Sequence, residues 1–273
     1  MGFTGFTGAP LRVSARAARR VALWLAGSAL GTVTGVVTKE PLIALTFDDG
    51  PDPEYTPRLL EILERYGARA TFFMTGEAAN AHPELVRRIA QAGHAIGNHS
   101  WDHPSFPLIS GRERRAQIRA CARAIAPYGE RLFRPPYGEQ TIASWCDAFL
   151  LRHRVVMFDC WSDDWRGGDA ATIARQLEKR ARPGGIVILH DRLWDALDRA
   201  YFNREPMLEG LEIFLRRSLG RFRFVTVSEL LRRGKARKEF WRKRPDRKLL
   251  NELMLPDGPA RRYGPRGAGQ RRG

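Results

Sequence analysis

The sequence contains few cysteines and no apolar run long enough to cross a membrane unaided. Only 3 of its 273 residues are cysteine, and an odd number argues against a disulfide framework. None of the three lies in a recognisable Cys–His arrangement, so none is predicted to be a catalytic nucleophile. Near the N-terminus, residues 21–31 are apolar, but a bilayer span needs about 20 such residues.

Acidic residues are also scarce relative to basic ones, and the imbalance is confined to the two ends of the chain. The sequence has 46 Lys and Arg against 30 Asp and Glu, which gives a net charge of +16. Residues 232–273 hold 15 basic and 4 acidic residues, and residues 1–31 hold 4 arginines and no acid. Residues 32–231 therefore carry a net charge of only +1, and we interpret them as one nearly neutral domain.

The two ends predict an association with an anionic membrane surface. We interpret residues 1–31 as a signal peptide or a membrane-surface anchor, and favour an uncleaved anchor because the cleavage signal is poor. Residues 232–273 place Phe240 and Trp241 among cations and predict a basic, partly disordered tail. Nucleic-acid binding and a merely solvated tail are the alternatives. A membrane-associated or exported location is favoured over a cytoplasmic one.

Apolar periodicity predicts alternating strands and helices along the middle of the chain. Helices are expected over residues 56–66, 83–92, 112–126, 172–181 and 206–219. Strands are expected over residues 41–47, 70–75, 93–97, 131–138, 184–191 and 223–227, and Ser228 is expected to cap a final helix. This alternation predicts an α/β fold with parallel strands and helices outside them.

Titratable side chains follow four of these predicted strands. Asp48 and Asp49 end the first, and His99 and His103 follow another. Two imidazoles four residues apart on a helical turn share one face and can bind one metal ion. A carboxylate from elsewhere would complete three ligands and leave a position open for water, which suits metal-assisted hydrolysis. The His-x3-His pattern alone is weak evidence, but its place at a strand end strengthens it.

Five motifs in fixed order resemble those of the polysaccharide deacetylase family, also called the NodB homology domain. They are TFDDGP at 46–51, ATFF at 70–73, HSWDH at 99–103, RPPYG at 134–138 and LHD at 189–191. The resemblance covers residues 32–231 and implies a distorted, incomplete (β/α) barrel. It further implies an N-acetylated glycan as the substrate and a monomeric enzyme.

The resemblance also implies a metal centre and a base. Asp48 would be the general base that activates the attacking water. Asp49, His99 and His103 would hold a divalent metal ion, expected to be Zn²⁺, with Co²⁺ and Mn²⁺ as alternatives. Arg134 would hold and tune Asp48 through a charge-assisted pair.

Further residues are implied to act on the leaving group and the sugar. His190 would be the general acid, paired with Asp164, although the adjacent Asp163 could take that place. The backbone N–H of Tyr137 would donate to the oxyanion. A last group would contact the substrate: Trp165, Pro136, Ile188 and Leu189. The family usually has leucine two residues before the catalytic histidine, where this sequence has Ile188, so the acetyl pocket could differ in shape.

Taken together, the resemblance implies a metal-dependent hydrolase that removes N-acetyl groups from N-acetylglucosamine-type sugars. Peptidoglycan, chitin oligomers and lipid-linked glycans are the candidate substrates. Hydrolysis of another small amide or a formamide is an alternative. Glycan binding without turnover is disfavoured because every titratable motif residue is present, and nucleic-acid binding rests on the two ends alone.

Overall fold

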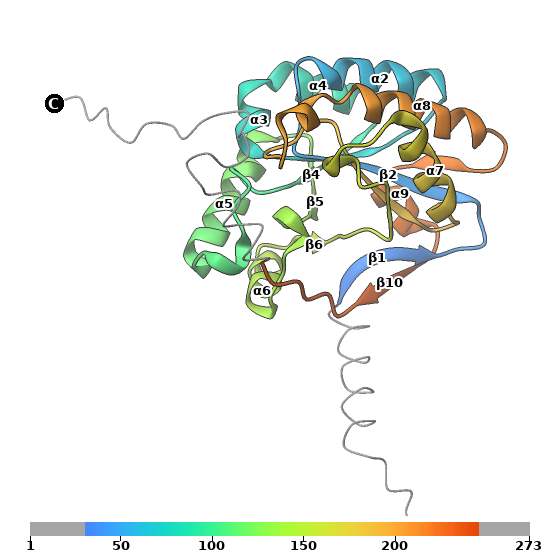
Figure 1. Cartoon of the computed structure of the whole chain (residues 1–273). Coiled ribbons are helices and arrows are strands. Elements are labelled where there is room, and N and C mark those ends of the chain that lie inside the picture. Colours follow the sequence, from blue (N-terminus) through green and yellow to red (C-terminus); the bar gives the residue numbers. More distant parts are fainter. Residues whose placement is uncertain (1–30, 246–273) are drawn as a thin grey trace, which may run out of the picture.

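At the centre of the structure, a computed structural model that describes residues 31–245, a parallel sheet curls into an incomplete barrel (Figure 1). The strand order is β6-β5-β4-β3-β2-β8-β7, and β9 pairs with β2. The bounds are β2 Leu42–Asp48, β3 Thr71–Met74, β4 Ala95–Asn98, β5 Gly129–Phe133, β6 Arg154–Val155, β7 Cys160–Trp161, β8 Ile186–His190 and β9 Arg223–Val225. The predicted α/β barrel of the NodB type is confirmed.

Helices cover the outer side of the sheet, as the alternating pattern predicted (Figure 1). They are α2 Tyr55–Arg65, α3 Gly76–Ala81, α4 Pro83–Gln91, α5 Gly111–Ala124, α6 Ile142–Leu150, α7 Ala170–Arg180, α8 Glu205–Arg217 and α9 Val227–Arg232. Most are amphipathic; in α2, for example, Leu59 and Leu63 are fully buried in the core that also contains Phe47 and Phe72 of the strands. Among residues 31–245 no helix is long and apolar enough to cross a membrane.

The N-cap predicted for the last helix was wrong. Helix α9 begins at Val227, and its capping side chain is Thr226, whose hydroxyl accepts a hydrogen bond from the Glu229 N–H at 3.1 Å. Ser228 lies inside the first turn and its hydroxyl donates to Glu130 instead. Threonine and serine are both common N-cap residues. Strand β9 ends at Val225, two residues before the predicted end, so the helix begins earlier and Thr226 becomes the cap.

A two-stranded antiparallel ribbon packs against the open seam of the barrel (Figure 1). It pairs β1 Thr32–Val37 with β10 Lys235–Glu239. The ribbon contacts both sides of the seam, because Met157 N–H donates to the Val33 carbonyl at 2.7 Å and Val36 N–H donates to the Gly184 carbonyl at 2.8 Å. The catalytic domain was expected to end at residue 231. Strand β10 lies beyond that residue and pairs with β1, so regular structure continues past the expected boundary. The part of the expected basic tail beyond residue 245, and the expected N-terminal anchor up to residue 30, lie outside the described residues.

Candidate active site

The central strand β2 delivers two neighbouring carboxylates to the C-terminal edge of the sheet. Asp48 is its last residue and pairs in register with His190 of β8. Asp49 follows in the left-handed region, with φ of 72°. Because side chains alternate along a strand and the backbone turns sharply at Asp49, the two carboxylates can serve different partners.

Three buried side chains converge on one point above this edge. The Oδ1 atom of Asp49 lies 3.3 Å from Nε2 of His99 and 3.2 Å from Nε2 of His103. The three candidate ligand atoms all lie within 4.8 Å of one another. One carboxylate and two imidazoles at this spacing form a candidate site for a divalent metal ion.

The sequence spacing predicted that the two histidines lie on a helical turn, but they do not. Residues 99–103 form a loop after β4, with Ser100 at φ 69° and His103 at φ 56°. The loop is held by its own polar groups: Ser100 N–H donates to the Asn98 side-chain oxygen at 2.9 Å, and His103 N–H donates to the Ser100 hydroxyl at 3.2 Å. Strained backbone at such positions persists where the surrounding structure fixes it, which is common at functional sites.

Hydrogen bonds around the triad orient its members. The Nδ1 atom of His99 lies 2.7 Å from the Arg134 carbonyl oxygen, which leaves Nε2 directed at the triad. The Trp194 N–H donates to Oδ2 of Asp49 at 2.9 Å, whereas Oδ1 is buried and has no hydrogen-bond donor among the described residues. Burial works against charge on Asp49, but the imidazoles of His103 and His99, 3.2 and 3.3 Å from Oδ1, hold its pKa well below the usual range.

Arg134 forms a buried ion pair with Asp48. Its guanidinium donates to Oδ1 of Asp48 and to the Thr46 hydroxyl, each at 2.7 Å. It also donates to the backbone carbonyls of Val156 and Met157 at 3.2 and 3.1 Å. This satisfied guanidinium fixes the Asp48 carboxylate and keeps its second oxygen, Oδ2, turned toward the triad, 3.9 Å from Nε2 of His99.

His190 ends β8 beside Asp48 of β2 and contacts a second carboxylate. Nδ1 of His190 lies 3.3 Å from both oxygens of Asp164, and the His190 N–H donates to Oδ2 of Asp164 at 3.1 Å. The structure therefore places Asp164, not Asp163, against the imidazole. Burial opposes charge on the imidazole, but the charge and hydrogen bond of Asp164 outweigh it and raise the pKa of His190. His190 is thus suited to hold a proton near neutral pH.

Arg204 was missed in the sequence, yet it joins these two residues. Its buried guanidinium donates to the Asp164 side chain, to the Asp164 carbonyl at 3.1 Å and to the His190 carbonyl at 3.1 Å. Arg204 precedes α8 in a segment without a motif, so no pattern marked it. A buried guanidinium without a counter-charge destabilises the fold, and the Asp164 carboxylate supplies that counter-charge.

The Tyr137 loop approaches the metal triad from β5. Tyr137 adopts φ 57°, and its ring lies edge-on to His103 with ring centres 4.5 Å apart. Its hydroxyl donates to Asp195 at 2.7 Å. The strained backbone directs this loop across the site, so its peptide groups are candidates for contacts with a substrate carbonyl.

The segment after β10 holds the Tyr137 loop from outside. The indole N–H of Trp241 donates to the Gly138 carbonyl at 2.8 Å, and the Lys243 ammonium donates to the Tyr137 carbonyl at 2.8 Å. Gln140 and Lys243 also pair through their backbones, with N···O distances of 3.0 and 3.3 Å. Residues that the sequence assigned to the basic tail are therefore part of the site's support.

Residues after β8 complete the surroundings of the site and were also missed. Trp194 stacks on His103 with ring centres 5.9 Å apart, and Asp195 binds Tyr137. Asp191 lies beneath the Asp48–Asp49 turn, where burial, with a contribution from Asp52, raises its pKa to about 7. The Trp194–Asp195 pair shortly after LHD is a signal that could have identified this segment.

The expected substrate-contacting residues do not all face the site. Trp165 lies edge-on to His190 with ring centres 5.5 Å apart, and Pro136 and Ile188 lie at the same edge of the barrel. The prediction that Leu189 contacts the substrate is wrong, because its side chain is fully buried in the core between the sheet and the helices. Adjacent strand residues face opposite sides of a sheet, so Ile188 and Leu189 cannot both line one pocket.

The cysteines fit their expected lack of a catalytic role. Burial raises the pKa of Cys121 to about 12 and that of Cys160 to about 12, so both remain thiols at neutral pH. Cys146 is exposed on α6. Nucleophilic catalysis by a thiolate is therefore not supported by the two buried cysteines.

Several known proteins are similar to this chain in sequence and in architecture. A sequence model of the family described as polysaccharide deacetylase matches residues 35–154. A peptidoglycan-N-acetylglucosamine deacetylase of Bacillus cereus is 36% identical over 208 residues, which cover 73% of this chain and 94% of the relative. A chitooligosaccharide deacetylase of Azorhizobium caulinodans is 36% identical over 173 residues, covering 60% of this chain and 80% of the relative.

A solved structure agrees with these sequence matches. It is that of a peptidoglycan N-acetylglucosamine deacetylase in complex with 4-naphthalen-1-yl-N-oxidanyl-benzamide. Its TM-score against this chain is 0.70 at 29% sequence identity, and the match covers 78% of this chain and 98% of the other. The similarity therefore extends over the barrel and its site.

Proposed function

Because this chain belongs to the polysaccharide deacetylase family, we propose that it is a hydrolase that removes N-acetyl groups from N-acetylglucosamine-type sugars of a glycan. Membership makes it a polysaccharide N-deacetylase. The observation that carries the finer proposal is the grouping of the Asp49–His99–His103 triad with Asp48 on one side and His190 on the other. Amide hydrolysis needs an acid as well as a base, and the site offers one of each.

The triad fits a divalent metal ion by its own chemistry. Asp49 offers a buried oxygen without a hydrogen-bond donor among the described residues, and His99 is held so that Nε2 faces it. We propose that Asp49, His99 and His103 hold the ion, with Zn²⁺ favoured by the mixture of imidazole and carboxylate donors. When bound, such an ion supplies Lewis-acid polarisation and makes water more acidic.

Asp48 is proposed as the general base. It is buried beside the triad and held by Arg134 through one oxygen, which leaves the other to accept a proton from the attacking water. Asp48 does not share the ligand position of Asp49, so proton transfer and metal binding are divided between neighbouring carboxylates. Fixing the base in advance reduces the reorganisation needed during the reaction.

His190 is proposed as the general acid. An amine leaves poorly unless it is protonated, and Asp164 raises the pKa of the His190 imidazole, which favours its protonated form. The backbone N–H of Tyr137 is proposed to donate to the developing oxyanion, since its loop crosses the site beside His103. The acid and the base then act from opposite sides of the scissile amide.

An aromatic hollow next to His190 supports a glycan as the substrate. The hollow has a volume of about 550 Å³ and extends from Trp165. Its lining includes Phe158, Trp161, Trp165, Trp241, Arg180 and Arg182. Aromatic side chains with a few polar groups are typical of binding sites for organic ligands and suit the apolar faces of sugar rings. Acetate release from chitooligosaccharides and peptidoglycan fragments, with N-formyl analogues alongside, tests the proposal.

Replacing Asp164 by asparagine should move the basic limb of the kcat–pH profile to lower pH. His190 must be protonated to act as an acid, so activity falls as the pH rises through its pKa. Removing the Asp164 charge leaves burial to lower that pKa, and the loss of rate should be greater at high pH than at low pH. The measurement is kcat at saturating substrate across the range of about pH 5 to 8 in which histidine titrates and into more alkaline buffers, with the folded fraction checked by circular dichroism.

Asp163→Asn is the matched control, because Asp163 adjoins Asp164 in the chain but it is Asp164 whose carboxylate contacts the His190 imidazole. Its profile should match that of the unchanged enzyme. A basic limb that stays in place in Asp164→Asn would remove His190 from the role of acid.

Replacing Trp241 by alanine should lower kcat about tenfold, since a small displacement of an oxyanion donor costs rate, and should also raise KM, because Trp241 lines the aromatic hollow. The substitution removes the hydrogen bond to Gly138 that supports the Tyr137 loop. Phe240→Ala is the control, because the neighbouring Phe240 is exposed and contacts Arg242 rather than that loop. Equal kcat values per folded, metal-loaded molecule in the two variants would show that Trp241 acts only on stability.

A further inference from the structure

Helix α6 (Ile142–Leu150) exposes apolar side chains and buries polar ones. Its buried residues include Ser144 and Asp147, whereas Ile142, Phe149 and Leu150 are 54%, 58% and 69% exposed. The turns of a helix place residues 142, 149 and 150 on one face. Large apolar side chains gathered on a surface mark an interaction site more often than scattered ones do.

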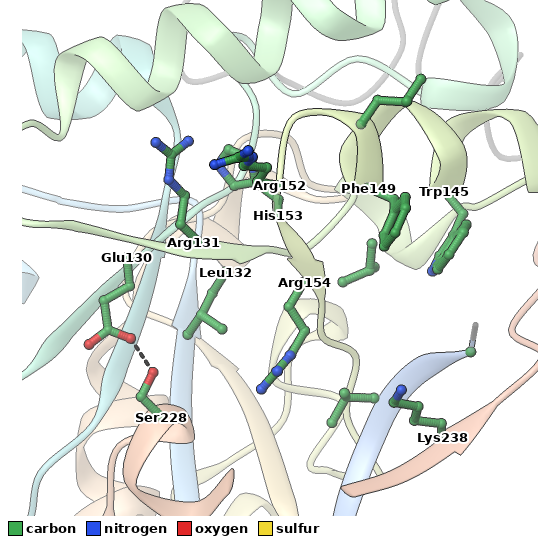
Figure 2. Close-up of a pocket in the computed structure, with 14 residues that line it drawn as sticks. Glu130, Arg131, Leu132, Trp145, Phe149, Arg152, His153, Arg154, Ser228 and Lys238 are labelled. Carbon is green, nitrogen blue, oxygen red and sulfur yellow. Dashed lines mark hydrogen bonds between the residues drawn. The ribbon is translucent and has the colours of Figure 1, made fainter. Parts of the chain in front are cut away.

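A hollow of about 760 Å³ adjoins this face, away from the metal triad (Figure 2). Figure 2 shows Trp145 and Phe149 side by side at one end of the hollow, opposite Glu130 and Ser228. The two aromatic rings are stacked, with centres 5.2 Å apart and planes inclined by 11°. The apolar face of α6 thus continues into a concave surface.

Arginines surround the hollow. Arg131, Arg152 and Arg154 line it, and none of them has a carboxylate within ion-pairing distance among residues 31–245. Lys238 of β10 is a fourth cation at the rim, and Glu130, the acid in the lining, accepts a hydrogen bond from Ser228. Arginine at a protein surface commonly pairs with an acid, so three that lack one present a positive field to an external anion.

We propose that α6 and the adjoining arginine-lined hollow form a docking surface for an anionic lipid bilayer. Phe149 and Leu150 enter the boundary between headgroups and acyl chains, while Arg131, Arg152 and Arg154 contact lipid phosphates. An apolar face flanked by cations is the arrangement by which peripheral proteins bind anionic membranes. The planar guanidinium suits phosphate, because it can donate two hydrogen bonds to one group.

The docking surface and the catalytic residues lie at different ends of the strands. Glu130 and Arg154 lie at the starts of β5 and β6, whereas Asp48 and His190 end β2 and β8. The docking therefore does not depend on catalysis.

Vesicle co-sedimentation of the full chain tests the docking surface. Vesicles of phosphatidylglycerol with phosphatidylcholine should bind the protein, and vesicles of phosphatidylcholine alone should bind it much more weakly. The double variant Phe149→Ser/Leu150→Ser and the triple variant Arg131→Gln/Arg152→Gln/Arg154→Gln should each lower the partition coefficient about tenfold or more. The triple variant should also show a smaller dependence of binding on salt.

The controls change the same chemistry elsewhere on the surface. Leu108→Ser/Leu219→Ser removes two residues that are 62% and 63% exposed, and Arg87→Gln/Arg216→Gln/Arg232→Gln removes three exposed arginines. If the double and triple variants of the docking surface bind vesicles as well as their controls do, the proposal is overturned. Any binding would then be assigned to the chain ends. A dimer that Phe149→Ser/Leu150→Ser dissociates, seen by sedimentation velocity, would replace the bilayer with a second copy of the chain.

Deacetylation of a soluble chitooligosaccharide is measured in parallel for every variant. The α6 residues lie outside the catalytic site, so these rates should be unchanged. Absence of turnover in all proteins, with normal vesicle binding, would contradict the proposed function and leave the docking surface in place.

Discussion

Replacing Asp48 by asparagine is expected to lower kcat by about two to four orders of magnitude, the usual contribution of a general base. The amide has nearly the same shape as the carboxylate and can still accept a hydrogen bond from Arg134, so the fold should persist. It cannot take a proton from water. Because Asp49, His99 and His103 are unchanged, the variant should bind one equivalent of metal like the original protein.

The measurement combines single-turnover and steady-state rates of acetate release with metal content by mass spectrometry. Asp169→Asn is the matched control, because Asp169 caps α7 and is not one of the metal ligands or their partners, and asparagine caps a helix equally well. A rate in Asp48→Asn close to that of the control would contradict the assignment of the base. A large loss of metal would show that Asp48 is a ligand.

Replacing His103 by alanine should remove metal and activity together. His103 offers one of three ligand atoms, and its loss should weaken metal binding by at least the 10- to 100-fold typical of an outer-shell partner. The remaining Asp49 and His99 cannot by themselves fix the ion. Metal content after dialysis and kcat/KM for acetate release should therefore fall in parallel, while circular dichroism remains that of the folded barrel.

His82→Ala serves as the control, since His82 precedes α4 and is not part of the triad. It should keep both metal and rate. Full metal content in His103→Ala would show that the three residues are wrongly grouped. Restored activity at high metal concentration would instead support a ligand that contributes affinity rather than chemistry.

The fold and the location of the site could be predicted because both depend on short-range patterns. Buried strands are visible in the sequence as apolar runs, and the motif residues stand at their ends, as Asp48 ends β2 and His190 ends β8. Parallel strands bring their C-terminal ends to one edge, which places these side chains together without knowledge of the loops. The loop of His99 and His103 was misjudged because its left-handed residues cannot be read from the spacing.

The features that the sequence did not predict depend on contacts between distant residues, or on a helix whose apolar side chains face solvent. The ribbon joins β1 to β10 across some 200 positions, and such pairing leaves no local pattern. Arg204 and Trp194 reach the site from segments that no motif marks. Helix α6 escaped prediction because its apolar residues face outward, which removes the amphipathic pattern by which helices are predicted.

Metal-dependent acetate release tests the central claim most directly. The purified protein is treated with a chelator, dialysed, and supplied with Zn²⁺, Co²⁺, Mn²⁺ or Mg²⁺, and acetate is measured from N-acetylglucosamine oligomers and from peptidoglycan fragments. We predict that chelation abolishes release, that one equivalent of Zn²⁺ restores it, and that His103→Ala shows no restoration. Acetate release that survives removal of the metal, or a metal-loaded protein that releases none from any N-acetylated glycan, would contradict this account.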